Sequence, residues 1–136
     1  VHCRPSDGTL DAYIDLLEII KSVKTQNPEL RFEVHCYTGD AATALKFVDL
    51  GGLIGLNGII TFDKTSRSRE VVDAVPLENI ILETDAPYLS PKSKRGQRNE
   101  PSYLPEVAET IAEWKNITVD VVAEQTTANS QRLFKI

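Results

Sequence analysis

The stretch Asn79-Ile80-Ile81-Leu82-Glu83-Thr84-Asp85 holds an unbroken apolar strand core that is followed at once by two carboxylates. A strand that is apolar at every position is typical of a parallel sheet whose two faces are both covered. Polar side chains directly after such a strand lie at the carboxyl edge of the sheet, where ligands and catalytic groups gather. The stretch therefore predicts a parallel α/β fold with a site at one edge of the sheet.

Strand and helix patterns alternate along the rest of the chain. We expect four strands, at residues 1–4, 32–36, 53–56 and 79–82, and helices at residues 10–23, 41–49, 68–74, 104–114, 119–124 and 128–134. Alternation of this kind is typical of a parallel sheet built from βα units. Periodicity alone does not choose between an open four-stranded sheet and half of an eight-stranded TIM barrel.

Composition excludes several classes of protein. The 136 residues suit one domain, and a hydrophobic share of 41% with 26% charged residues is typical of a globular chain. No apolar run approaches the roughly 20 residues of a membrane-spanning helix, and no secretory signal is present, so we expect no membrane partner. The two cysteines form no disulfide framework, which favours a reducing, cytoplasmic location. A net charge of −5 argues against binding nucleic acid by bulk charge but allows a local basic site.

Both histidines of the chain lie toward the C-terminal ends of predicted strands. His2 belongs to the first and His35 to the second, and Asp85 comes after the fourth. Two imidazoles and a carboxylate that converge from separate strands suit a divalent ion such as Zn²⁺ or Mn²⁺. Three protein ligands would leave positions open for water or substrate. The residues leave open the alternative that each histidine is only hydrogen-bonded at the edge of the sheet.

A basic loop follows the last predicted strand. Its four cations are Lys92, Lys94, Arg95 and Arg98. In an acidic chain, this cluster is the local site that fits the backbone of a nucleic acid. The alternatives are a solvated, mobile loop and a structural pair between Arg98 and Glu100.

The two cysteines each follow one of the histidines, at Cys3 and Cys36. Because strand side chains alternate between the two faces of a sheet, we expect both thiols to point toward the helices. There they would act as small buried hydrophobes.

Five motifs occur in a fixed order along the chain. They are Val1-His2-Cys3-Arg4, the segment at residues 34–39 (VHCYTG), the segment at 55–62 (GLNGIITF), the segment at 82–89 (LETDAPYL) and the segment at 95–101 (RGQRNEP). Together with the ending at residues 127–134 (TANSQRLF), they resemble the TatD family of metal-dependent deoxyribonucleases. That family belongs to the amidohydrolase-like TIM barrels, and the resemblance covers essentially the whole chain.

The resemblance implies roles for three residues. His2 and His35 match histidines that bind metal, and Asp85 matches an aspartate that binds the neighbouring metal or orients the attacking water. The resemblance also implies two divalent ions (Mg²⁺, Mn²⁺ or Zn²⁺), which together activate water and neutralise the phosphate. We expect Asp85 to be the catalytic general base, because a carboxylate beside a metal-bound water can take its proton. The alternative is that Asp85 only caps the end of the strand.

The resemblance also shows what this chain lacks. The family's His-x-His pair and its metal-bridging glutamate are absent, and the chain begins without methionine inside an apparent strand. We therefore expect residues 1–136 to be a single partial domain, the second half of a barrel, whose partner is the missing half or a second copy of the chain.

The implied function is hydrolysis of DNA phosphodiester bonds, from the 3′ end. One alternative is a catalytically incomplete half-barrel that serves as a folding or interaction module. Another is a related amidohydrolase that acts on C–N or lactone bonds.

Overall fold

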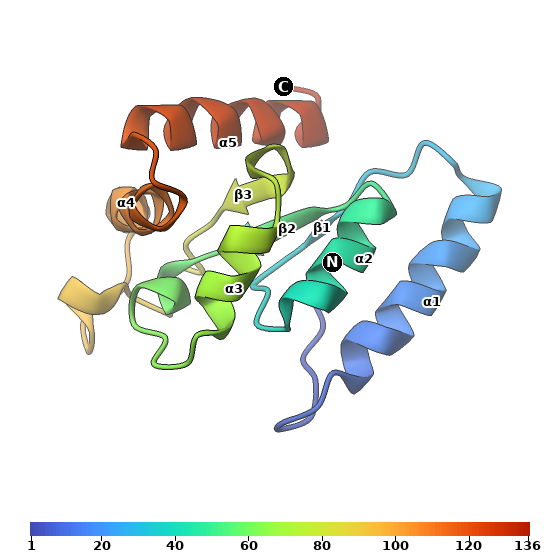
Figure 1. Ribbon diagram of the computed structural model, residues 1–136, viewed down its shortest axis with the longest axis horizontal. Coiled ribbons are helices and arrows are strands. Elements are labelled where there is room, and N and C mark those ends of the chain that lie inside the picture. The colour runs from blue at the N-terminus through green and yellow to red at the C-terminus, as the bar shows by residue number, and fades with distance from the viewer.

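The sheet of this protein has three parallel strands. A computed structural model describes all residues, 1–136. Strands β1 (Glu33–Val34), β2 (Leu53–Leu56) and β3 (Ile80–Leu82) lie side by side in that order, with β2 in the middle (Figure 1). Every residue of β2 is buried, because the strand has a neighbour on each edge and its side chains are covered on both faces. The predicted α/β class with a parallel sheet is therefore confirmed.

Five α-helices accompany the sheet. They are α1 (Asp11–Gln26), α2 (Ala41–Asp49), α3 (Arg67–Ala74), α4 (Leu104–Lys115) and α5 (Val119–Phe134). Apolar side chains from all five helices and all three strands form one core, in which Tyr13, Phe47, Ile54 and Ile111 are fully buried. Burying one such side chain stabilises the fold by about 1.5–3 kcal/mol relative to leaving it exposed. None of the helices combines the length and the apolar character needed to cross a bilayer.

The expectation of a fourth strand at residues 1–4 is wrong. The ammonium group of Val1 donates to the Glu33 carbonyl at 2.6 Å, and the Val1 carbonyl accepts from the His35 N–H at 2.9 Å. Only this one residue pairs beside β1, and the backbone then leaves the sheet toward α1. A strand needs successive residues to pair in a ladder, so residues 1–4 form none.

The C-terminal part of the chain is one continuous helix, α5, rather than the two short helices that we expected. Thr126, which interrupts the apolar pattern, donates its hydroxyl hydrogen to the Val122 carbonyl one turn earlier at 2.8 Å. The fully buried Asn129 donates its amide hydrogens to the Leu77 and Ile80 carbonyls, both at 2.8 Å. These tertiary bonds tie α5 to the start of β3 (Figure 1), which the apolar pattern of a single segment does not reveal.

Substituting Asn129→Ala removes both of these bonds and leaves two carbonyls without protein partners. We expect a loss of about 2–3 kcal/mol in the free energy of unfolding, because unsatisfied buried polar groups are costly. Asn27→Ala, at an exposed position after α1, is the control and should change the free energy by less than about 0.5 kcal/mol. Urea unfolding followed by circular dichroism measures both, and equal midpoints for the two variants would refute the assigned role of Asn129.

Candidate metal centre

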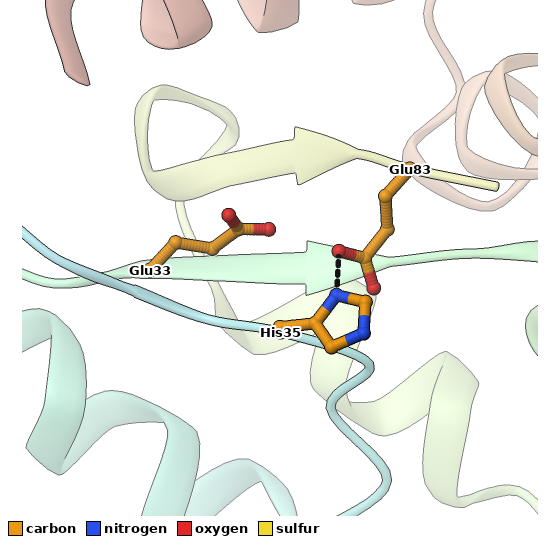
Figure 2. Close-up of side chains that lie close together, drawn as sticks. All are labelled: Glu33, His35 and Glu83. Carbon is orange, nitrogen blue, oxygen red and sulfur yellow. Dashed lines mark hydrogen bonds and ion pairs between the residues drawn. The ribbon is translucent and has the colours of Figure 1, made fainter. Parts of the chain in front are cut away.

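Polar side chains from the ends of two outer strands meet above the middle strand. Glu33 lies in β1 and His35 follows it, two positions apart, so strand periodicity places both on one face of the sheet. Glu83 comes directly after β3 and reaches back across β2. Figure 2 shows the three side chains converging from these elements, with the imidazole of His35 beside the carboxylate of Glu83.

Gly55 in β2 leaves the space in which these carboxylates lie. A Cβ atom at this position would contact Oε1 of Glu33 and would lie 2.9 Å from Oε2 of Glu83. Any larger residue would therefore push the two carboxylates apart. The glycine belongs to the site because the functional side chains need the volume above it.

Two carboxylates hold the imidazole of His35. Its Nδ1 lies 2.5 Å from Oε2 of Glu83, and its Nε2 lies 2.9 Å from Oδ1 of Asp85. The other oxygen of Glu83 accepts the backbone N–H of Cys36 at 2.6 Å, which fixes the direction of the carboxylate. Burial lowers the pKa of His35, but the hydrogen bond to Glu83 and the charges of both carboxylates outweigh it, and the pKa is raised.

Asp85 is positioned by its own backbone and by one buried amide. It has a φ of 56°, in the left-handed region that few residues other than glycine adopt. Asn57, which is 2% exposed, donates from Nδ2 to Oδ2 of Asp85 at 3.0 Å and accepts the N–H of Ile59 at 3.1 Å. The Asp85 carboxylate thus contacts the side chains of His35 and Asn57, whereas a loop cap would accept from a backbone N–H.

Cys36 lies in the site, and the expectation that its thiol points toward the helices is wrong. Its φ of 50° breaks the strand alternation on which that expectation rested. The Asn57 amide donates to Sγ at 3.1 Å. Burial raises the pKa of Cys36 to about 11, with the carboxylate of Asp85 adding to the effect, so the thiol stays protonated at neutral pH. Cys3 is half-buried and packs against the core.

Glu33 is the functional candidate that the sequence reasoning missed. Its Oε1 is buried and has no hydrogen-bond partner. Burial and the neighbouring Glu83 raise the pKa of Glu33 to about 7. Its position two residues before His35 was the available signal, because that spacing puts both side chains on one face of a strand.

Two overlapping groups of side chains have the spacing needed to hold a metal ion. One is Glu33, His35 and Glu83, and the other is Cys36, Glu83 and Asp85; in each, the ligand atoms lie within 4.8 Å of one another. His2 belongs to neither group. Its exposed ring lies 5.5 Å from the ring of His35, centroid to centroid. The structure therefore brings His35 and Asp85 into contact and places His2 beside His35.

Two of the four cations of the basic loop contact aromatic rings of the protein. The Arg95 guanidinium stacks at 4.0 Å over Phe62, and the Lys94 ammonium lies 5.4 Å from the Tyr103 ring. Lys92 and Arg98 are exposed, and Arg98 makes no ion pair with Glu100, so the expected structural pair is absent.

The loop is also tied to the strand end by one buried side chain. Asn99 is 2% exposed and donates to the Thr84 and Tyr88 carbonyls, both at 2.6 Å. The segment around Asn99 is therefore held against the site, one residue away from Arg98.

Residues 1–135 match the family described as TatD related DNase. The chain belongs to the TatD family. The match extends over nearly every residue, as the resemblance of the five motifs implied.

Relatives of the TatD family share much of this sequence. The chain is 40% identical over 128 residues to a protein of Escherichia coli K12 named "Uncharacterized metal-dependent hydrolase YcfH", covering 94% of this chain and 48% of that protein. It is 34% identical over 141 residues to the "3'-5' ssDNA/RNA exonuclease TatD" of Klebsiella pneumoniae, covering all of this chain and 51% of that protein. The chain spans about half the length of these relatives.

A solved structure supports the same assignment. The crystal structure of YjjV, a TatD homologue from Escherichia coli K12, superposes with a TM-score of 0.85 at 30% sequence identity. The superposition covers 99% of this chain and 49% of the YjjV chain. The fold of residues 1–136 is therefore similar to about half of a TatD-family structure.

The raised pKa of Glu33 predicts a pH-dependent stability in metal-free protein. The folded state holds this proton more tightly than the unfolded chain, so the favourable contribution present below pH 4.5 is lost as the pH rises through about 7. As the pH rises from about 5 to 8, the free energy of unfolding of Glu33→Gln should increase relative to that of the wild type by about 1–2 kcal/mol. This value is discounted for partial solvent screening. Urea unfolding in the presence of a chelator at a series of pH values measures this. Glu29→Gln, at an exposed position, is the control, and a matching pH profile for the two variants would refute the burial of a protonated Glu33.

Proposed function

We propose that this chain carries part of the active site of a metal-dependent nuclease that hydrolyses phosphodiester bonds of DNA from the 3′ end. The observation that carries the proposal is the contact between Nε2 of His35 and Oδ1 of Asp85, at 2.9 Å, at the carboxyl edge of the parallel sheet. Ligands and catalytic groups gather at this edge in parallel α/β proteins. The name of the Klebsiella relative, an exonuclease on single-stranded DNA and RNA, supports the reaction class.

The donor set of the site fits a divalent ion such as Mg²⁺, Mn²⁺ or Zn²⁺. Mn²⁺ and Zn²⁺ bind both imidazole nitrogen and carboxylate oxygen, and Mg²⁺ binds carboxylate oxygen. The buried oxygen of Glu33 that lacks a hydrogen-bond partner is available as a further metal ligand. We propose His35 and Asp85 as ligands, with His2 joining them from the adjacent segment and a second ion in the complete enzyme. A bound divalent ion supplies a polarised water and neutralises charge on the phosphate.

In this proposal, two residues of the chain position the metal ligands and a third accepts a proton. Glu83 holds Nδ1 of His35 and so leaves Nε2 to face the ion, which is the usual role of a carboxylate behind a metal-binding histidine. Asn57 fixes Asp85 through its Oδ2. Asp85 is our candidate catalytic residue, and its carboxylate, held by Asn57, would take the proton of the attacking water.

We further propose that residues 1–136 are one partial domain that corresponds to the second half of a TIM barrel. The coverage of about half of each relative supports this. The outer edge of β3 is unpaired. Beside it, an apolar cavity of about 240 Å³ is lined by Leu82, Leu104, Ala108 and Val119. An open edge next to an apolar surface favours the second candidate function, a module that pairs with the other half-barrel or with a second copy of the chain.

We also propose that the protein works in the cytoplasm, because both of its cysteines are free thiols.

The direct test of the proposed function compares Asp85→Asn with Asp49→Asn, an exposed control at the end of α2. Calorimetric titration with Mn²⁺ should show a loss of affinity of at least about tenfold for Asp85→Asn, and none for the control. In the complete enzyme, which supplies the rest of the barrel, single-stranded DNA labelled at its 5′ end should be shortened from the 3′ end only with added metal, and Asp85→Asn should abolish this cleavage. If the wild-type chain binds no Mn²⁺ and the complete enzyme leaves the DNA intact, the nuclease proposal fails and the module is favoured.

The basic loop, with Lys92, Lys94, Arg95 and Arg98, is our proposed contact with the DNA backbone. Arg98 is exposed and has no ion pair, so it should contribute more than Arg95, which stacks on Phe62. We expect Arg98→Ala to reduce the slope of log affinity against log salt for single-stranded DNA by about 0.7, the value for one lost phosphate contact. Fluorescence anisotropy at several salt concentrations measures the slope. Lys21→Ala, on the outer face of α1, should leave the slope unchanged, and an unchanged slope for Arg98→Ala would remove that residue from the interface.

A further inference from the structure

A second cavity lies beside the candidate metal centre. It has a volume of about 480 Å³, within the range of pockets that hold small ligands. Five parts of the chain line it: the N-terminal segment, the segment after β1, the first turn of α3, and single residues at Ile59 and Leu89. The cavity adjoins the candidate metal centre, because Cys36 belongs to both and because the lining residue His2 lies beside His35.

Two guanidinium groups line this cavity, from Arg4 and Arg67. Neither takes part in an ion pair or a side-chain hydrogen bond, although the chain has 20 acidic residues against 15 basic ones. Asp7 is the one carboxylate on the lining. Asp40 lies within electrostatic reach of Arg67, but its carboxylate is already engaged by the Thr43 N–H at 2.8 Å. Two free guanidinium groups therefore face a hollow that carries a single negative side chain.

We propose that this cavity binds a phosphate group of the substrate strand, next to the phosphate that is cleaved, and that Arg67 is the residue that recognises it. The proposal rests on the proposed nuclease function and names a second contact point for the same substrate. A guanidinium is planar and donates two parallel hydrogen bonds to a phosphate, which makes it suited to this ligand. The hydroxyl group of Ser6 on the lining adds a neutral donor.

Because the cavity lies beside the metal centre, a phosphate bound in it would orient the substrate strand for the reaction. His2 lines the cavity and also lies beside His35, so a phosphate held by Arg67 and Arg4 is next to the proposed ion. A substrate strand fixed at this second phosphate presents the neighbouring bond to Asp85 in a defined orientation. Arg67 thus acts in binding and positioning.

The test is a binding measurement on the metal-free chain, which separates it from the nuclease activity. The ¹⁵N-labelled protein is titrated in a chelator with thymidine 5′-monophosphate, inorganic phosphate or thymidine, and the amide shifts of His2 and Thr38 are followed by NMR. We expect thymidine monophosphate to bind more tightly than inorganic phosphate, and thymidine to cause no shift. Arg67→Gln should weaken the binding of thymidine monophosphate by about tenfold, the usual loss for one charge-assisted contact. Arg69→Gln is the matched control, because Arg69 is in the same helix and pairs with Asp73 on the exposed surface.

Three results would overturn the proposal: equal affinities for Arg67→Gln and Arg69→Gln, equal affinities for thymidine and its monophosphate, or binding of inorganic phosphate alone. Because the titration contains no metal, its outcome is independent of the Asp85→Asn test. If the protein binds thymidine monophosphate but does not cleave DNA, only the nuclease function is contradicted. If it cleaves DNA but does not bind thymidine monophosphate, only this site is contradicted.

Discussion

The site depends on one arrangement, the imidazole of His35 held between the carboxylates of Glu83 and Asp85. His35 follows one outer strand and the two carboxylates follow the other, so the contact exists only because β1 and β3 both pair in parallel with β2. The space above β2 is open at Gly55, where a Cβ would strike the carboxylates. The contact of His35 with the two carboxylates therefore depends both on the strand pairing and on the absence of a side chain at Gly55. The large buried core holds the strands in register.

The same arrangement concentrates negative charge in a partly buried place. Glu33 and Glu83 approach each other above β2, and the protein accommodates them by raising the pKa of Glu33 to about 7 and by raising the pKa of His35. Carboxylates gathered in this way, with one unpartnered oxygen, form a site that gains stability from a cation. The exposed guanidinium groups of Arg4 and Arg67 line the cavity beside this site, where our proposal places a phosphate of the substrate.

Much of this could be predicted from the sequence where the signal is local. The apolar run at residues 80–82 indicated the parallel sheet, Asp40 indicated the start of α2, and the polar residues after the strands indicated the edge at which His35 and Asp85 meet. The features that the sequence reasoning missed depend on tertiary contacts. The gap expected between two short helices at residues 125–127 is helical, and the bonds of the buried Asn129 to β3 could not be read from the sequence. The left-handed backbone of Cys36 turns its thiol into the site against the strand alternation. The sequence alone gives Glu33 as a solvent-facing strand residue. Only the structure shows that Gly55 leaves room for the carboxylates of Glu33 and Glu83 side by side.

The central claim, that the strand ends hold a divalent ion between His35 and Asp85, is tested most directly by anomalous diffraction from crystals soaked in Mn²⁺. The account predicts an anomalous peak within about 2.0–2.2 Å of Nε2 of His35 and of a carboxylate oxygen of Asp85, with their direct contact opened. A map with no peak at these residues, and with the contact of 2.9 Å intact, would contradict it.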